Sequence, residues 1–407
     1  MSVSLWRRWS KPALHRAEVA VLGGGITGIS AALALERAGV DALVVERHDV
    51  ASGASGRNAG FLMRGAADNY AAGARELGRD ATRRLWRWTE ENLAMLRAEG
   101  VESLPSYKRV PSALLALTDE EAAELLESVR LMREDGFAVE WAESGTDRVW
   151  ASGLPKGALL NPGDGSVNPV DLLRMLRGKL RREPLLHHEV SAITLDGAGV
   201  RLHAAQAVIE ASRCLVGLNA FTPLLLPGVE GVIVPRRGQM LAVRTGRVVF
   251  DMSYYAHHGS EYFRQATPEV AVVGGWRKHF VDEEVGYDDR TTENVQRGIE
   301  GFAEQFLGRG LDVTARWAGT MGFTADGLPV IGPVDERGGP AKADSPLWIC
   351  GGYTGHGMSM GFKTAHAAAA AMMTGAENPF PLTRAAIGRR QGRAAPGCGP
   401  GGVCSGG

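Results

Sequence analysis

The sequence predicts an α/β fold in which a Rossmann-like nucleotide-binding domain is interrupted by a second domain built on a mainly antiparallel β-sheet. Three observations support this fold class. An apolar segment near the N-terminus, residues 19–22, runs directly into a glycine-rich turn, and residues 347–350 repeat this arrangement near the other end of the chain. Each segment is typical of a buried strand that is followed by a helix. The region between Pro227 and Arg316 is instead rich in short β-type segments, which indicates a separate sheet inserted between the two glycine turns.

The bulk composition is that of a globular enzyme. The chain has 407 residues, a formal charge of −1 and 44% hydrophobic residues, which fits more than one domain. Because no basic stripe is visible, no nucleic-acid partner is expected. No apolar run reaches the roughly 18 residues that span a bilayer, so no membrane span is expected, and the oligomeric state stays open. The cysteines are too sparse for a disulfide framework, which fits a cytoplasmic location: Cys214, Cys350, Cys398 and Cys404.

The first glycine turn predicts a dinucleotide site. Gly23 permits the tight turn, Gly25 lets phosphates approach the backbone, and Gly28 lets the next helix pack closely on the strand. The start of that helix presents free N–H groups to a pyrophosphate. Glu46 ends the following strand at the distance where a carboxylate binds ribose hydroxyls, which excludes a 2′-phosphate cofactor. A glycine-rich turn alone would be weak evidence, and a purely structural turn is the alternative.

Periodicity and turn residues predict the remaining elements. Helices are expected over 28–38, 68–100, 119–134 (capped by Thr118 and Glu121), from 168 onward, 292–307 and 358–373. Strands are expected over 42–46, 112–117, 189–195, 199–203, 206–211, 214–218, 238–243, 261–265 and 270–275. Residues 153–165 are rich in Gly and Pro and are expected to form a loop.

Three motifs together identify a family resemblance. They are the turn Gly23–Gly28 with Glu46, the segment Ser55-Gly-Arg-Asn-Ala-Gly60, and Asp326-Gly-Leu-Pro followed by Gly352-Tyr-Thr-Gly-His-Gly-Met358. In this combination and order, from about residue 17 to 375, the chain resembles the FAD-dependent D-amino-acid oxidase superfamily. The similar branch contains glycine oxidase, sarcosine oxidase and γ-glutamylputrescine oxidoreductase.

The resemblance implies FAD as the cofactor. Positions that carry a covalent tether in some relatives hold Asn58, Gly319 and Thr320 here, so noncovalent binding is expected. His356 either donates a hydrogen bond to the flavin or only shapes the turn. The residues expected to bind FAD are Gly23, Gly25, Ile26, Thr27, Gly28, Glu46, Arg47, Ser55, Arg57, Asn58, Ala59, Gly60, Val190, Gly352, Gly355, His356, Gly357 and Met358.

The same resemblance implies a discontinuous domain arrangement. The ranges expected are an N-terminal arm (1–15), an FAD-binding domain (16–104, 164–226 and 318–376), a substrate domain (105–163 and 227–317) and a flexible tail (377–407).

The expected reaction is oxidation of the C–N bond of a small amine or amino acid, by hydride transfer to flavin N5 and hydrolysis of the resulting imine. Two departures from the resemblance concern substrate and oxidant. Met321 stands where glycine-oxidase-like proteins hold a carboxylate with an arginine, and Val273 stands where sarcosine-oxidase-like proteins place a lysine for oxygen activation. Fast reaction with O2 is therefore in doubt, and the electron acceptor is O2 or another carrier.

The expected catalytic residues are Tyr255, Tyr262, Arg264, Trp276 and His356, with Tyr254, His257 and Met321 as further lining. No His or Cys spacing indicates a metal site. Two alternatives stay open: a flavin enzyme acting on a methylaminomethyl-modified tRNA base, and a noncatalytic FAD-binding protein.

Overall fold

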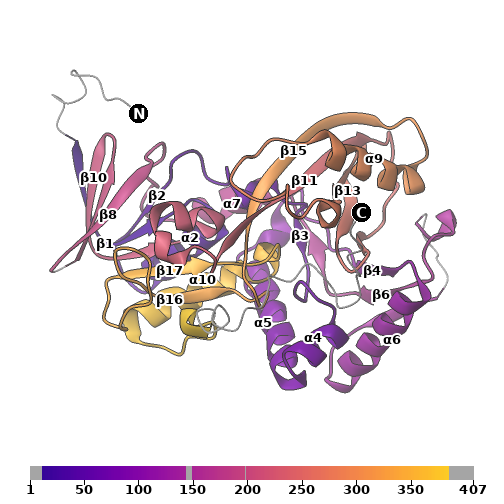
Figure 1. Ribbon diagram of the computed structural model, residues 1–407, viewed down its shortest axis with the longest axis horizontal. Helices are drawn as coiled ribbons and strands as arrows, with labels where there is room; N and C mark the ends of the chain where they lie inside the picture. The colour runs from indigo at the N-terminus through magenta and orange to yellow at the C-terminus, as the bar shows by residue number, and fades with distance from the viewer. Residues whose placement is uncertain (1–11, 144–148, 198, 385–407) are drawn as a thin grey trace, which may run out of the picture.

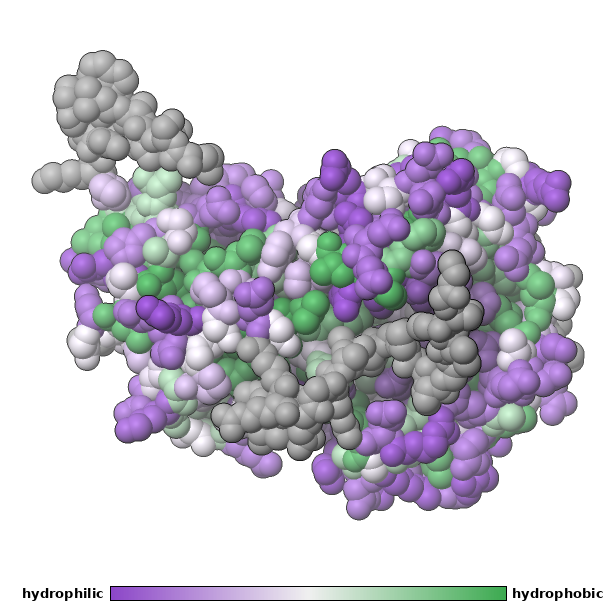
Figure 2. Space-filling model, viewed as in Figure 1, coloured by the Kyte–Doolittle hydropathy of each residue, from purple (hydrophilic) through white to green (hydrophobic). Residues whose placement is uncertain are grey.

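The computed structural model describes residues 12–143, 149–197 and 199–384. Two large sheets lie next to each other, one in the left half of Figure 1 and one in the right half, with helices packed around them. Hydrophobic residues gather over the first sheet and between the sheets on the face shown in Figure 2, whereas the outer rim is mainly hydrophilic. Within the described ranges, no helix is long and apolar enough to cross a membrane, and no cluster of His, Cys, Asp and Glu could hold a metal ion.

The first sheet has the parallel centre that the sequence predicts. Its strands are β1 (Ala13–Leu22), β2 (Ala42–Val45), β8 (Val190–Asp196), β9 (Gly199–Ala204), β10 (Ala207–Val216), β16 (Val330–Pro333) and β17 (Leu347–Gly351). The order is β16-β17-β10-β1-β2, with β9 and β8 continuing antiparallel from β10. Because β2, β1, β10 and β17 are parallel, their carboxyl ends meet at one edge. Both glycine turns therefore leave the sheet at this edge.

Two long helices that follow these turns pack together on the sheet. Helix α2 (Ile26–Arg37) follows β1, and α10 (Gly357–Thr374) follows β17. A Cβ atom at Gly361 of α10 would lie only 3.0 Å from Cγ2 of Ile26, so the helices approach closely. Helix α5 (Arg79–Ala98) packs against α10. The arrangement brings the N-termini of α2 and α10 to the same edge of the sheet.

The second sheet is mainly antiparallel, as predicted. Its order is β15-β11-β14-β13-β12-β4-β6-β5, and only β12 and β4 pair in parallel. The strands are β4 (Ser112–Ala116), β5 (Glu140–Ala142), β6 (Gly157–Asn161), β11 (Val234–Arg244), β12 (Ser253–Ala256), β13 (Glu261–Thr267), β14 (Val270–Gly275) and β15 (Asp312–Phe323).

The two faces of this second sheet have different neighbours. The outer face, with Leu241 and Phe263, packs on helix α9 (Glu293–Leu307). The inner face carries Met240, which packs on Phe61 and Met63. These two residues belong to the segment that follows β2 of the first sheet. Strand alternation therefore decides which side chains of this sheet point toward the glycine turns.

Shorter elements lie between the strands of the two sheets along the chain. They are α3 (Ala54–Arg57), α4 (Tyr70–Glu76), α6 (Asp119–Glu134), α7 (Pro169–Arg177), α8 (Thr222–Leu225), the pair β3 (Phe61–Leu62) and β7 (Gly165–Ser166), and 3-10 turns at Val101–Ser103, Trp150–Ser152, Asn219–Phe221, Pro227–Val229 and Arg277–His279.

The helices expected over 68–100 are α4 and α5, which separate where Gly78 adopts a positive φ of 84°. Three expectations about local structure need correction. The loop expected over 153–165 contains β6, which pairs with β4 and β5. Strand β10 is continuous where two segments were expected. The end of the expected arm, residues 13–15, belongs to β1 and pairs with β10, whereas residues 1–11 lie outside the described residues.

The expected tail from residue 377 begins with an ordered, docked segment. Phe380 packs edge-on against Trp88, with ring centroids 5.3 Å apart. Arg384 pairs with Asp326 through contacts of 2.6 Å and 3.3 Å. Residues 385–407 lie outside the described residues. The expected boundary at residue 317/318 falls inside β15, which runs on to Phe323, and the division into domains stays a prediction.

Candidate functional site

The first glycine turn has the geometry that a bound phosphate requires. Gly23 has a φ of 104°, and its N–H donates to the carbonyl of Val45 at 2.9 Å. A Cβ atom at Gly28 would lie 1.8 Å from the Gly23 carbonyl oxygen, so only glycine fits there. Helix α2 then begins without a side-chain cap on Gly25. Apart from the N–H of Ile26, which donates to Ser55, its first N–H groups and the positive end of its dipole consequently open toward the turn.

Glu46 is fixed at the end of β2. Its two carboxylate oxygens accept from the N–H of Gly24 at 2.6 Å and from the N–H of His48 at 2.8 Å. A Cβ atom at Gly24 would lie 3.0 Å from Cγ of Glu46, so the turn and the carboxylate are closely packed. Each carboxylate oxygen has a second lone pair that can accept from a ribose hydroxyl.

The segment 55–60 folds over the start of α2. Ser55 Oγ accepts from the N–H of Ile26 at 2.9 Å. The Asn58 amide donates to the carbonyls of Ala54 and Ser55 at 3.0 and 2.9 Å, and its oxygen accepts from the N–H of Gly60 at 2.7 Å. Asn58 thus shapes the turn with its own side chain.

Arg57 and Trp317 join this segment to the second sheet. The Arg57 guanidinium donates to the Ala318 carbonyl at 2.9 Å, and the Trp317 indole N–H donates to the Arg57 carbonyl at 2.9 Å. The segment is therefore held between the two sheets, and Arg57 also lies 3.2 Å from a carboxylate oxygen of Asp289.

The second glycine turn is strained in the same region. Gly352, Thr354 and Gly355 have φ angles of 78°, 48° and 85°. The N–H of Gly352 donates to Asn219 Oδ1 at 2.8 Å, and α10 starts without a side-chain cap. A strained backbone is maintained only where the surroundings determine it, and this is common at ligand sites.

Tyr353 links the two turns directly. Its hydroxyl lies 2.8 Å from Thr27 Oγ1 on α2 and 3.4 Å from Cys350 Sγ on β17. Burial and the Cys350 thiol raise the pKa of Tyr353, so the hydroxyl stays protonated. The two turns, which come from opposite ends of the chain, therefore form one structure.

A cleft of about 920 Å³ runs along both turns, within the roughly 300–1,000 Å³ of ligand sites. The expected residues that line it are Gly23, Gly25, Ile26, Thr27, Glu46, Arg47, Ser55, Arg57, Asn58, Val190, Gly355, Gly357 and Met358. Lining residues that the sequence did not suggest include Gly24, Asn219, Phe221, Tyr287, Asp289, Thr320 and Tyr353. A signal for Asn219 was present, because it follows a parallel strand of the same sheet. Arg47 lies 4.5 Å above the Phe221 ring at one part of the cleft.

Five residues expected to bind FAD do not line this cleft. Gly28 packs on the Gly23 carbonyl, and the Gly352 N–H is used by Asn219. The carbonyls of Ala59 and Gly60 accept from Arg264 and from the N–H of Val167. The fifth residue, His356, lines a neighbouring pocket.

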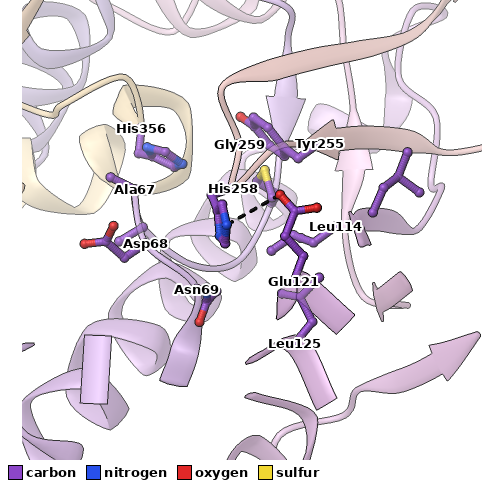
Figure 3. Close-up of a pocket in the computed structure, with 13 residues that line it drawn as sticks. Ala67, Asp68, Asn69, Leu114, Glu121, Leu125, Tyr255, His258, Gly259 and His356 are labelled. Carbon is purple, nitrogen blue, oxygen red and sulfur yellow. Dashed lines mark ion pairs between the residues drawn. The ribbon is translucent and has the colours of Figure 1, made fainter. Parts of the chain in front are cut away.

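This second, smaller pocket lies between His356 and the second sheet (Figure 3). Its volume is about 40 Å³. The ring of His356 lies nearly parallel to that of Tyr255, with centroids 6.4 Å apart. His258 faces Glu121 across the pocket at 3.4 Å. Asp68 also lines this pocket, and burial is the main cause that raises its pKa.

His356 is neutral in this environment. Burial lowers its pKa, and Nδ1 lies 3.2 Å from the Thr354 carbonyl. Because a carbonyl only accepts, Nδ1 carries the proton and Nε2 is left as an acceptor. Burial raises the pKa of Tyr255 and raises that of Tyr262 to about 12, so both phenols are neutral donors.

Three expected catalytic residues line neither cavity: Tyr262, Arg264 and Trp276. Arg264 is buried and donates to the backbone carbonyls of Ala59, Val167 and Gln265, so it lines neither cavity. A Cβ atom at Gly298 of α9 would lie 2.0 Å from the Trp276 ring, so this ring packs on α9. The donors of Arg264 are used by backbone carbonyls and the Trp276 ring turns toward the outer helix, and the catalytic roles expected for them stay predictions.

Comparison with known protein families decides the class of this site. The model of the DAO family, described as FAD dependent oxidoreductase, matches residues 18–371. The chain belongs to this family. It is an oxidoreductase whose cofactor is FAD, and the cleft fits this group, because glycines keep its floor free of Cβ atoms and Glu46 lies beside the turn. In the described part of the chain the cysteines, Cys214 and Cys350, are buried in strands, and neither lines the cleft.

Individual relatives agree with this family. The chain is 26% identical over 371 residues to γ-glutamylputrescine oxidoreductase of Escherichia coli K12, covering 84% of this chain and 80% of that protein. It is 28% identical over 332 residues to the bifunctional tRNA 5-methylaminomethyl-2-thiouridine biosynthesis protein of Maricaulis maris, covering 78% of this chain and 47% of that protein. The glycine oxidase structure from Geobacillus kaustophilus has the same fold, with a TM-score of 0.73, 20% identity and coverage of 91% and 98%.

Proposed function

We propose that this flavoprotein oxidises the C–N bond of a small amine or amino acid. The observation that carries the proposal is the junction of both glycine turns at Tyr353, next to the inner face of the second sheet. When bound, FAD supplies a hydride acceptor at flavin N5 for the C–H bond beside a neutral amine, which gives an imine that water hydrolyses.

The chain's own groups would hold the cofactor at both ends. Glu46 and the open start of α2 suit the ribose and pyrophosphate. The uncapped start of α10 presents free N–H groups and a positive dipole end, which favour negative charge on a bound group.

Three glycines on the inner face leave room for the side chains of other residues, which are Met321, Tyr262 and Arg57. Gly238 and Gly319 are cross-strand partners, and Gly274 lies on the next strand. The Tyr262 ring lies flat on Gly274, where a Cβ atom would be 2.5 Å from the ring. The Tyr262 ring and the Met321 side chain give this face an apolar surface, which suits a small substrate.

The surroundings favour a neutral amine. Tyr255, Tyr262 and His356 are neutral, and Arg236 and Arg277 add positive charge on this side of the sheet. Burial and nearby cations both disfavour an ammonium ion. Nε2 of neutral His356 is available to accept a hydrogen bond from the amine.

The test is anaerobic reduction of bound flavin, followed by its absorbance. Glycine, sarcosine, D-alanine, proline, putrescine and γ-glutamylputrescine form the substrate panel. Bleaching by at least one of these amines is expected, with release of the matching carbonyl product. A yellow protein whose flavin is reduced by dithionite but by none of these or related amines would contradict the proposal and favour a noncatalytic FAD-binding protein.

The second candidate function is action on a methylaminomethyl-modified tRNA base. The similarity to the Maricaulis maris protein favours it, although the chain covers less than half of that protein. The formal charge of −1 counts against nucleic-acid binding. Binding of tRNA that weakens steeply with salt would support this alternative, and its absence would remove it.

A further inference from the structure

The inner face of the second sheet carries a positive group without a partner. Arg277 follows β14, and its guanidinium carbon lies 4.7 Å above the Phe323 ring. Among the described residues, this guanidinium has no hydrogen bond and no ion pair. A partly buried arginine normally pairs with a carboxylate or with carbonyl groups. Arg277 therefore has donors that a ligand can use.

The neighbouring charges do not neutralise Arg277. Arg236 is the cross-strand partner of Met321 on the inner face, and it donates to the Val281 carbonyl at 2.8 Å. Glu284 is the acidic residue nearby, and Arg237 and Gln239 already hold it on the outer face at 2.6 Å and 3.0 Å. The inner face at this position thus has a net positive charge.

The electrostatic surroundings of Arg277 and the nearby Tyr262 hydroxyl both fit a binding site for an anion. Burial and the charge of Arg236 lower the pKa of Arg277, so its charge is poorly compensated in the protein alone. The Tyr262 hydroxyl interacts electrostatically with Arg277 and has no hydrogen-bond partner in the described part of the chain. A guanidinium and a protonated phenol both donate hydrogen bonds, which suits an anion.

This position adjoins the cofactor cleft. Met321 lines the cleft, and its Cε would lie 2.8 Å from a Cβ atom at Gly238 on the inner face. Met321 is also the position where the sequence lacks the arginine expected for a carboxylate. The positive charge missing at residue 321 is present on the adjacent strand, at Arg236, and on the segment after β14, at Arg277.

We propose that Arg277, supported by Arg236 and the Tyr262 hydroxyl, binds a carboxylate of the substrate and so selects amino acids over simple amines. The proposal rests on the proposed amine oxidation. It assigns Arg277 as a specificity residue that acts through substrate binding, and the chemistry of the flavin is unaffected by it.

The experiment compares the holoenzyme with Arg277→Met, Arg277→Lys and the control Arg290→Met. Arg290 is 82% exposed and, among the described residues, pairs only with Asp288 of its own turn, so the control removes a similar charge elsewhere. Two dissociation constants are measured: that of the amine from the rate of anaerobic flavin reduction, and that of propionate, a nonreactive carboxylate, from the change in flavin absorbance. Paired substrates are sarcosine with dimethylamine, D-alanine with ethylamine, and proline with pyrrolidine.

Loss of a charge-assisted pair predicts that Arg277→Met weakens binding of the carboxylated amine and of propionate about 10- to 100-fold. Arg277→Lys should lose less, since it keeps the charge without the planar fork. Arg290→Met should stay within about twofold, and the limiting reduction rate should change little in all variants.

Three outcomes separate the two proposals. If Arg277→Met binds propionate and the substrate with unchanged affinity at normal flavin content, the proposed carboxylate binding by Arg277 is overturned. Flavin reduction by simple amines in preference to their carboxylated partners also overturns it, while amine oxidation stands. If no amine reduces the flavin, the proposed function fails, and the propionate titration still decides whether Arg277 binds a carboxylate. Should Arg277→Met not fold, Arg277→Gln and Arg277→Lys provide the same comparison.

Discussion

The replacement Gly28→Ala tests the first glycine turn most sharply. The added Cβ atom would lie 1.8 Å from the Gly23 carbonyl oxygen, whereas Cβ contacts under 3.0 Å essentially never occur. The turn or the start of α2 must therefore move by more than 1 Å. Because the obstructing atom belongs to the backbone, rotation of a side chain cannot relieve the contact. Overpacking of this kind costs about 1–3 kcal/mol, and the displaced N–H groups are those that would face the pyrophosphate.

We expect Gly28→Ala to weaken FAD binding by about 10-fold or more, and to destabilise the apoprotein by about 1–3 kcal/mol. FAD affinity is measured by quenching of flavin fluorescence on titration with apoprotein, and stability by urea unfolding. Gly301→Ala is the matched control, because a Cβ atom at Gly301 of α9 meets nothing within 4 Å. It should leave FAD affinity unchanged and stabilise the protein by up to about 1 kcal/mol. Native FAD affinity in Gly28→Ala would refute the assigned role of the turn.

Three further predictions follow from buried or fixed polar groups. Glu46→Ala removes the acceptor for the N–H of Gly24 and a ribose partner, so FAD titration should show affinity reduced about 10-fold or more; unchanged affinity would exclude Glu46 from the site. Tyr353→Phe leaves the buried Thr27 hydroxyl unpaired and should lower the urea unfolding free energy of the apoprotein by about 1–3 kcal/mol; a neutral effect would show that the link between the turns is unimportant. Burial raises the pKa of Asp164 to about 7, so the folded state favours its protonated form, and stability from this group falls as pH rises from about 4 through 7. Asp164→Asn should flatten that part of the stability profile, and an unaltered pH dependence in urea unfolding would assign it to other groups.

The opening β-α-β unit was predictable because its signals are local. Apolar residues, Gly23 and Glu46 lie within one continuous stretch, and the structure pairs β1 with β2 as expected. Strand β10, which covers the strands expected over 206–211 and 214–218, joins this sheet between β1 and β17. Strand β6 was missed because a Gly- and Pro-rich segment has weak strand character, and its pairing with β4 and β5 depends on distant residues.

The substrate side was less predictable because it depends on register and on turns. Tyr262 and Arg264 share the inner face, as alternation requires, but Arg264 pairs opposite Val272, where backbone carbonyls consume its donors. Trp276 has a φ of 65°, so the chain turns there and its ring reaches α9. Neither result could be obtained from spacing alone. The start of the expected tail, similarly, was misplaced because Phe380 and Arg384 find partners far away in the sequence.

The most direct measurement is the FAD content of the purified chain before and after acid precipitation. The account predicts one FAD per chain, held in the native protein and released completely into the acid supernatant, with loss of binding in Gly25→Val. A colourless protein that takes up no FAD on reconstitution would contradict the central claim, and flavin that stays with the precipitated polypeptide would contradict noncovalent binding.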